Sequence, residues 1–241
     1  GELDPVRRDQ SEAVVRRHGP ERRIETLHAA GAVELHQVRG EGARAVAEAI
    51  AGARRIILTT PVNADGDGVG SEVAMVHLLR ALGKQVSIAN PTPIPDRYRF
   101  LVEPIARHDR TADAKQALRD ADLFLVLDIA ALSRLGHLAE TIRARDIVTA
   151  CIDHHLSPGT LPAGPRLVDA EASATAELVC DLTAVNGWTM GAEAARALYV
   201  GILTDTGGFR FSNTTPRVLR VAASLLETGV DPERVYESVY A

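Results

Sequence analysis

Acidic residues and histidines occur at four points of the sequence, each after an apolar segment. They are Asp65, Asp67, Asp128, Asp153, His154, His155 and Asp205. Carboxylate oxygens and imidazole nitrogens together suit Mn²⁺ or a similar divalent ion. The set has enough donors for two ions about 4 Å apart, the arrangement that stabilises attacking and leaving oxygens in phosphoryl transfer. These residues therefore predict metal-assisted chemistry on a phosphate.

Each of these residues also has a structural explanation when it is considered alone. Asp65 and Asp67 belong to Asp-Gly pairs, which form turns and cap helices. Asp128 could cap the next helix in the same way, and Asp205 could order its own turn. A buried histidine such as His154 is often a satisfied core residue. The metal site is favoured because the structural explanation would have to hold independently at each position.

The elements that must position these residues alternate between strands and helices. Strands are predicted at 56–59, 85–89, 123–127 and 147–152, with helices at 43–51, 69–82, 112–119 and 135–144. This alternation predicts an α/β fold with a doubly wound, mostly parallel sheet and helices on both faces. Helices alone follow, at 173–185, 192–203, 216–228 and from residue 232, which form a helical C-terminal section. Ligands of such sheets bind at the carboxyl ends of the strands, where the acids and histidines fall.

The chain divides into an N-terminal extension, residues 1–42, and one α/β domain, residues 43–241. Hydrophobic residues make up 46% of the composition, which is enough for a core. The net charge of −5 argues against binding to long duplex nucleic acid, and no apolar run is long enough to span a membrane. The two cysteines, Cys151 and Cys180, fit two buried thiols in a reducing compartment. We expect a cytoplasmic protein and leave its oligomeric state open, a homodimer included.

The loop "NADGDGVGS", residues 63–71, looks at first like a phosphate-binding turn that opens a helix. Its glycines, Gly66, Gly68 and Gly70, are one residue short of the dinucleotide-binding pattern GxGxxG. Two carboxylates inside the loop would also repel a phosphate. This repulsion is removed when the carboxylates hold divalent cations, because the cations present positive charge to the phosphate.

Four motifs in this order resemble those of the DHH phosphoesterase family. "NADGDGVGS" resembles its first motif, "VLDIAALSRLG" its second, "IDHH" its third and "GILTDTGGFRFSNTT" its fourth. The resemblance covers roughly residues 45–231. The fourth motif and "SRLG" look most like the branch of bacterial oligoribonucleases and pAp phosphatases.

The resemblance implies a hydrolase that uses one or two Mn²⁺ ions, with Mg²⁺ as the alternative, and a metal-activated hydroxide. Its substrates would be short oligonucleotides or small nucleotides such as pApA, pAp or the products of cyclic dinucleotides. The implied metal ligands are Asp65, Asp67, Asp128, His154 and Asp205, with Asp128 shared by both ions. His155 would contact the phosphate or assist the leaving oxygen, and Asp153 would orient the neighbouring histidine. The expected substrate-binding residues are Ser71, Arg134, His155 and Arg210.

Two departures from the family pattern support an alternative. The first motif of the family usually begins with a histidine four residues before the first aspartate, where this chain has Pro61. Proline cannot bind a metal, and the nearby amide of Asn63 is a poor replacement for imidazole. We also expect the smaller C-terminal substrate domain of this branch to be absent, because the sequence ends at Ala241. The alternative is a catalytically weak or inactive module that binds metal or nucleotide. A pyrophosphatase of the wider family fits less well, because it too would need the histidine at position 61.

Overall fold

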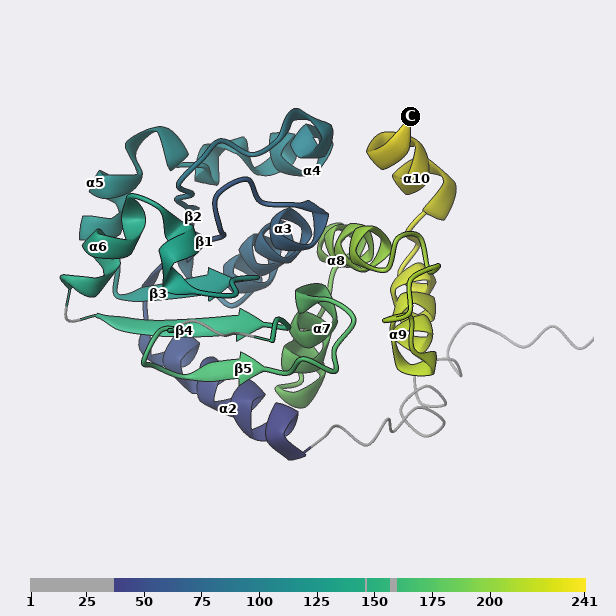
Figure 1. Cartoon of the computed structure of the whole chain (residues 1–241), viewed down its shortest axis with the longest axis horizontal. Helices are drawn as coiled ribbons and strands as arrows, with labels where there is room; N and C mark the ends of the chain where they lie inside the picture. The colour runs from purple at the N-terminus through teal and green to yellow at the C-terminus, as the bar shows by residue number, and fades with distance from the viewer. Residues whose placement is uncertain (1–36, 146, 157–159) are drawn as a thin grey trace, which may run out of the picture. The chain divides into compact units, whose positions relative to one another are not determined.

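The computed structural model describes residues 37–145, 147–156 and 160–241. Its centre is a sheet of five parallel strands in the order β2-β1-β3-β4-β5 (Figure 1). The strands are β1 (Arg55–Thr59), β2 (Gln85–Ile88), β3 (Leu123–Leu127), β4 (Val148–Asp153) and β5 (Arg166–Val168). Because β1 has β2 on one side and β3 on the other, the chain reverses its winding direction between β1 and β3. Ligand sites of doubly wound sheets lie at the carboxyl ends of the strands at this point.

Helices cover both faces of the sheet, as the sequence predicts. One face packs against α2 (Gln37–Gly52), α3 (Gly66–Ala81) and α7 (Thr175–Val185), and α8 (Ala192–Asp205) packs on α3 and α7. The other face packs against α5 (Ala114–Arg119) and α6 (Leu138–Arg143). The C-terminal section continues with α9 (Pro216–Glu227) and α10 (Pro232–Tyr240). Short elements complete the described chain: η2 (Asp96–Tyr98), α4 (Arg99–Val102), η3 (Glu103–His108), η4 (Thr111–Asp113) and η5 (Leu132–Leu135).

The apolar patterns of the strands explain this layering. All five residues of β3 are buried, which confirms that the run "LFLVL" is covered on both faces. Along β1, Ile56 and Leu58 enter the core beneath α3, whereas Ile57 enters the core beneath α5. Successive side chains of a strand point to opposite faces, so the two cores are separated by the sheet alone.

Several details differ from the sequence prediction, among them the following three. Strand β5 was not predicted, because only three residues form it and only Leu167 of these is buried. Helix α2 begins at Gln37, so it includes the end of the segment that we assigned to an extension; the rest of that segment, residues 1–36, lies outside the described residues. The predicted helix at 135–144 is shorter in the structure, where α6 begins at Leu138: Leu135 ends η5, and Gly136 follows it with a φ of 52°.

Helices α3 and α8 approach closely at Gly70. A Cβ atom on this residue would lie 2.4 Å from the carbonyl oxygen of Ala197 and 3.0 Å from the nitrogen of Gly201. Only glycine permits this backbone approach, which brings the start of α3 against the end of α8. Aspartates from the two helices, Asp67 and Asp205, are thereby placed at the same edge of the sheet. In the described part of the chain, no helix is both long and apolar enough to cross a membrane.

Candidate metal centre

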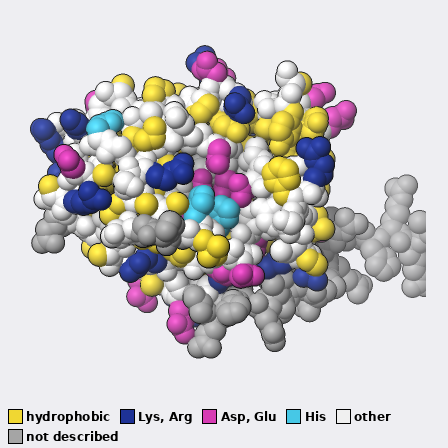
Figure 2. All heavy atoms as spheres, viewed as in Figure 1, with side chains coloured by type: hydrophobic (Ala, Val, Ile, Leu, Met, Phe, Trp, Pro, Cys, Tyr) yellow, Lys and Arg dark blue, Asp and Glu magenta, His cyan; other side chains and the backbone are white. Residues whose placement is uncertain are grey.

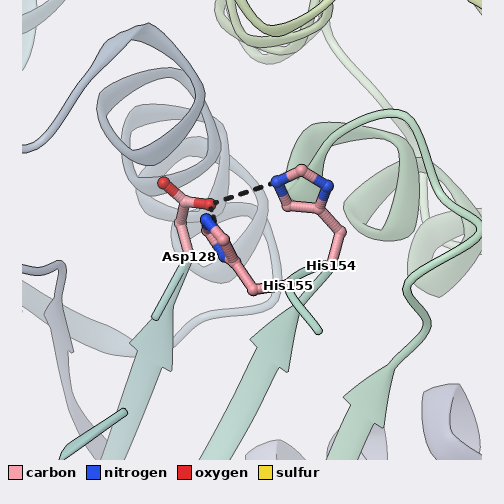
Figure 3. Close-up of side chains that lie close together, drawn as sticks. All are labelled: Asp128, His154 and His155. Carbon is pink, nitrogen blue, oxygen red and sulfur yellow. Dashed lines mark ion pairs between the residues drawn. The ribbon is translucent and has the colours of Figure 1, made fainter. Parts of the chain in front are cut away.

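Acidic residues and histidines from four elements meet at the carboxyl edge of the sheet. Asp128 follows β3, His154 and His155 follow β4, Asp67 lies in the first turn of α3, and Asp205 ends α8. Figure 3 shows both imidazole rings beside the Asp128 carboxylate. The Oδ1 atom of Asp128 lies 3.7 Å from His154 Nε2 and 3.8 Å from His155 Nδ1. In the space-filling view, histidine and acidic side chains emerge together near the middle of this face (Figure 2).

Two overlapping groups in this cluster have ligand atoms close enough to share a metal ion. One is formed by Asp67, His154 and Asp205, and the other by Asp128, His154 and His155, with the ligand atoms of each group within 4.8 Å of one another. His154 Nε2 is 3.4 Å from Asp205 Oδ2 and 3.8 Å from Asp67 Oδ2. His154 therefore stands at the centre of the cluster.

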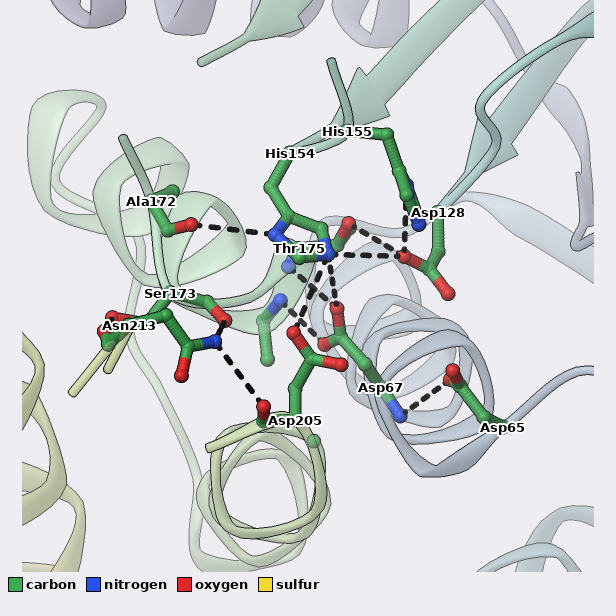
Figure 4. A network of polar contacts seen from close by, with 12 residues as sticks. Asp65, Asp67, Asp128, His154, His155, Ala172, Ser173, Thr175, Asp205 and Asn213 are labelled. Carbon is green, nitrogen blue, oxygen red and sulfur yellow. Dashed lines mark hydrogen bonds and ion pairs between the residues drawn. The ribbon is translucent and has the colours of Figure 1, made fainter. Parts of the chain in front are cut away.

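The ring of His154 is oriented for metal binding. Its Nδ1 atom lies 3.3 Å from the carbonyl oxygen of Ala172, as Figure 4 shows. A carbonyl oxygen only accepts, so the proton is on Nδ1 and the lone pair on Nε2 faces the carboxylates. A backbone carbonyl in this position is the usual partner of a metal-binding histidine.

The carboxylates are held in an environment that favours a cation. Burial raises the pKa of the Asp67 carboxyl, and the nearby Asp128 and Asp205 raise it further. Burial also raises the pKa of Asp128, as do the charges of Asp65 and Asp205. The acids lie close together and largely buried, so they repel one another, and a divalent cation would remove that repulsion. The donor set therefore fits Mn²⁺ or Mg²⁺.

Asp67 has the most extensive set of hydrogen bonds among these acids. Its Oδ2 atom accepts from the backbone nitrogen of Thr175 at 2.6 Å, and its Oδ1 atom accepts from that of Ala176 at 2.9 Å. Both donors belong to the first turn of α7, where the helix dipole favours a negative charge. The hydroxyl of Thr175 also donates to Asp128 Oδ1 at 3.1 Å. The start of α7 thus contacts two acids of the cluster.

Asp128 and His155 each show a further adaptation. The backbone of Asp128 has a φ of 57°, in the left-handed region, which costs roughly 1 kcal/mol for a residue other than glycine.

His155 Nδ1 lies 2.7 Å from Oδ1 of the buried Asp153, and this hydrogen bond raises the pKa of the His155 imidazole. Asp153 therefore orients His155 rather than His154. The His155 side chain is 38% exposed, so it can reach a ligand above the cluster.

The model of the DHH family N-terminal domain matches residues 55–202 of this chain. The chain belongs to the DHH family. The bifunctional oligoribonuclease and PAP phosphatase NrnA of Thermus thermophilus is 40% identical over 179 residues, which is 73% of this chain and 50% of that protein. The protein of the same name from Bacillus subtilis is 30% identical over 190 residues, or 77% of this chain and 56% of that protein. The chain spans about half the length of these relatives.

A solved structure of the same fold extends this comparison. The exopolyphosphatase-related protein of Bacteroides fragilis has a TM-score of 0.76 and 27% sequence identity, over 83% of this chain and 60% of its own. A putative family II inorganic pyrophosphatase of Methanococcus jannaschii shares the fold, with a TM-score of 0.54. The α/β fold predicted from the sequence is confirmed, as is the DHH resemblance.

The structure places the remaining predicted site residues in different ways. Asp65 is exposed and caps α3, because its Oδ1 atom accepts from the nitrogens of Asp67 and Gly68 at 3.0 and 3.1 Å. This is the structural role that we kept as an alternative, and Asp65 belongs to neither of the ligand groups in the described residues. Arg134 and Arg210 are exposed, and Arg210 Nε donates to the carbonyl oxygen of Gly207 at 2.8 Å.

Ser71, which the sequence predicts to bind substrate, stays a prediction, and its surroundings in the structure are polar. This side chain is fully buried, and its hydroxyl lies 3.4 Å from Asp67 Oδ1. Its contact is with a candidate metal ligand instead of a phosphate.

The segment 172–176 was not predicted to belong to the site of this DHH domain. It contributes the carbonyl of Ala172, the hydroxyl of Thr175 and two backbone N–H groups. Three of these four groups are backbone atoms, which every residue carries, so no residue type could indicate them. The threonine at the start of an apolar helix was the available signal, but it marks only where the helix begins and not which residues its first turn contacts.

Proposed function

We propose that this chain is a metal-dependent phosphoesterase that hydrolyses phosphate esters of short oligonucleotides and small nucleotides such as pApA and pAp. The observation that carries the proposal is the convergence of Asp67, Asp128, His154 and Asp205 beside a second, more exposed histidine. The names of the Thermus thermophilus and Bacillus subtilis relatives support this class of substrate. We also propose Mn²⁺ as the ion, with Mg²⁺ as the alternative.

Each group of the centre has a role in this proposal. A bound divalent ion supplies a water of lowered pKa and neutralises charge on the phosphate. Asp67, His154 and Asp205 would hold the ion, with Asp128 as a further ligand. We assign Asp65, at the entrance of α3, to a second and weaker ion position.

His155 is the candidate proton donor. Its Nδ1 is held by Asp153, so the opposite nitrogen, Nε2, is the one that can reach the departing oxygen. A proton delivered there lets the ester oxygen leave as a hydroxyl when the P–O bond breaks. Arg134 and Arg210, both exposed, are proposed to bind the other phosphate oxygens.

Pro61 favours a second candidate function, a module that binds metal or nucleotide without hydrolysis. Proline provides no ligand where the family motif has histidine, so the ion position near Asp65 has fewer donors. In that case nucleotide and Mn²⁺ raise the melting temperature while no phosphate ester is cleaved.

The test is hydrolysis of pApA and pAp by the whole chain with Mn²⁺. Asp128→Ala is the blank, because the Oδ1 atom of Asp128 lies within 3.8 Å of a ring nitrogen of each histidine. Asp113→Ala is the matched control, since Asp113 is an exposed acid that pairs with Arg110 away from the centre. We expect activity in the wild type and in the control and none in the blank. A folded wild type without Mn²⁺-stimulated hydrolysis, but with a nucleotide-dependent rise in melting temperature, would favour the binding module.

We propose three further properties of the chain. A cytoplasmic location agrees with Cys151 and Cys180, which are both free thiols. A homodimer is proposed as a hypothesis for size-exclusion measurements. The domain division of the sequence is proposed with one change: α2 belongs with the α/β domain, because its residues Ala43, Val46 and Ile50 are in the main core.

A further inference from the structure

One short segment, residues 172–176, contacts three of the candidate metal ligands. The carbonyl of Ala172 accepts from His154, the two N–H groups at the start of α7 donate to Asp67, and the Thr175 hydroxyl donates to Asp128. Figure 4 shows these contacts converging from one side of the cluster. The positions of three ligands therefore depend on where this segment is held.

Glu177 binds the segment 172–176 through the backbone of Ser173. Its side chain is fully buried, and its Oε2 atom accepts from the backbone nitrogen of Ser173 at 2.9 Å. Its other oxygen, Oε1, accepts from Arg39 Nη1 at 2.8 Å and from Arg217 Nη1 at 3.3 Å. One carboxylate thus connects the segment that contacts the ligands to two arginines on other helices.

The two arginines complete a buried ion network between α2, α7 and α9. Arg39 is 4% exposed and also pairs with Asp169, while its Nη1 lies 3.1 Å from Asp181 Oδ2. Arg217 pairs with Asp181 from the other side. Breaking a buried network of this kind leaves charges without partners, so the network fixes the relative positions of its members.

Both arginines lie outside residues 55–202, the part that the DHH model matches. Arg39 also lies in the segment that the sequence assigned to an extension. Neither arginine contacts a candidate metal ligand directly, and the chain of contacts from Arg39 to Asp67 passes through Glu177 and the first turn of α7.

We propose that Arg39, through Glu177, is a positioning residue of the metal centre: it fixes the segment 172–176 and thereby sets the affinity of the centre for a divalent ion. This inference rests on the proposed function, in which the cluster binds the ion. Residues that orient metal ligands typically change metal affinity by about 10- to 100-fold when they are replaced. The arginine on α2 is expected to act with this magnitude although it is remote from the ligands.

The experiment measures the dissociation constant for Mn²⁺ alone, by titration of free Mn²⁺ with the whole chain in electron paramagnetic resonance. Arg39→Met removes the charge and the hydrogen bonds, whereas Arg39→Lys keeps the charge and loses the planar fork of donors. We expect the dissociation constant to rise about 10- to 100-fold in Arg39→Met and by a smaller factor in Arg39→Lys.

Two controls separate positioning from general stability. Arg55→Met removes the exposed ion pair between Arg55, on β1, and Asp122. This change should leave the dissociation constant for Mn²⁺ unchanged. Leu118→Ala opens a cavity in the core beneath α5 and should lower the melting temperature without changing Mn²⁺ affinity. A purely structural role for Arg39 would give the same pattern as Leu118→Ala.

The outcomes are distinguishable. A folded Arg39→Met chain with the wild-type dissociation constant overturns the inference and leaves the proposed function intact. If Arg39→Met does not fold, Arg39→Lys decides: an unchanged dissociation constant overturns the inference, and an increased one supports it. A wild-type chain that binds no Mn²⁺ overturns both this inference and the proposed function.

Discussion

Replacing Glu72 by glutamine should remove a large part of the pH dependence of stability. Glu72 lies on α3 with its side chain fully buried, and its Oε2 atom accepts from Asn90 Nδ2 at 2.9 Å. The Oε1 atom has no hydrogen-bond partner among the described residues. Asn90 in turn accepts from the backbone nitrogen of Thr60, so this side chain supports the loop that follows β1. Glutamine keeps the volume and one acceptor oxygen but carries no charge at any pH.

The expected size of the stability change follows from the raised pKa of the Glu72 carboxyl. Burial raises the pKa of Glu72 from 4.5 to about 8, the charge of Asp109 adds to the rise, and the bond from Asn90 opposes it. Because the folded pKa is the higher one, the folded chain holds this proton more strongly than the unfolded chain. The associated stability is fully present below about pH 4.5, declines as the pH rises and is lost above about pH 8. At about 1.4 kcal/mol for each pKa unit, the loss is roughly 3 kcal/mol at pH 7 and roughly 5 kcal/mol above pH 8.

The assay is urea denaturation of the metal-free wild type and of Glu72→Gln, followed by circular dichroism at several values between about pH 5 and about pH 9. Other groups titrate over this range in both proteins, so the difference between the two curves isolates Glu72. We expect the stability of the variant, relative to the wild type, to increase with pH by several kcal/mol. Parallel curves would refute the reasoning, because they would mean that Glu72 is ionised in the folded chain at low cost.

Three further predictions concern the helices and the centre. Gly70→Ala should lower the free energy of unfolding by about 1 to 3 kcal/mol, because its Cβ would clash with the backbone of α8, and unchanged urea denaturation would contradict this. Asp128→Asn should raise the melting temperature of the metal-free chain, because it removes one of several acids that repel one another. It should also abolish the rise in melting temperature that Mn²⁺ produces in the wild type. A lower melting temperature of the metal-free variant would argue against the repulsion. Pro61→His should tighten Mn²⁺ binding or add a second bound ion in calorimetric titration, and an unchanged titration would show that an imidazole at this position does not reach the cluster.

Much of the fold follows from local patterns in the sequence. The run "LFLVL" is buried on both faces and could only be a central strand, and the alternation of such runs with amphipathic helices leads to a parallel sheet. Once the sheet is parallel, Asp128 and His154 must lie at the same edge, because all of its strands end there. Strand β5 escaped prediction because three residues with a single buried side chain carry too little pattern.

The candidate ligands were identified from residue type and strand position, but their contacts were decided by packing. The sequence alone could not separate a metal ligand from a helix cap at Asp65 or Asp67, since both stand in the same glycine loop. In the structure, Asp65 caps α3 and Asp67 points to the start of α7. The difference arises from the packing of α3 against the start of α7, which is a property of two helices and not of the loop.

The amino-acid sequence by itself determined the order of strands and helices, the edge at which the acids gather and the membership of the DHH family, because these depend on periodicity and on motifs within short stretches. Only the tertiary structure decided which atoms orient these acids. The groups that do so are backbone atoms of residues 172–176 and a buried network anchored by Arg39, more than a hundred residues away along the chain. Such contacts depend on how distant elements pack, and a backbone N–H group has the same appearance at every position of a sequence.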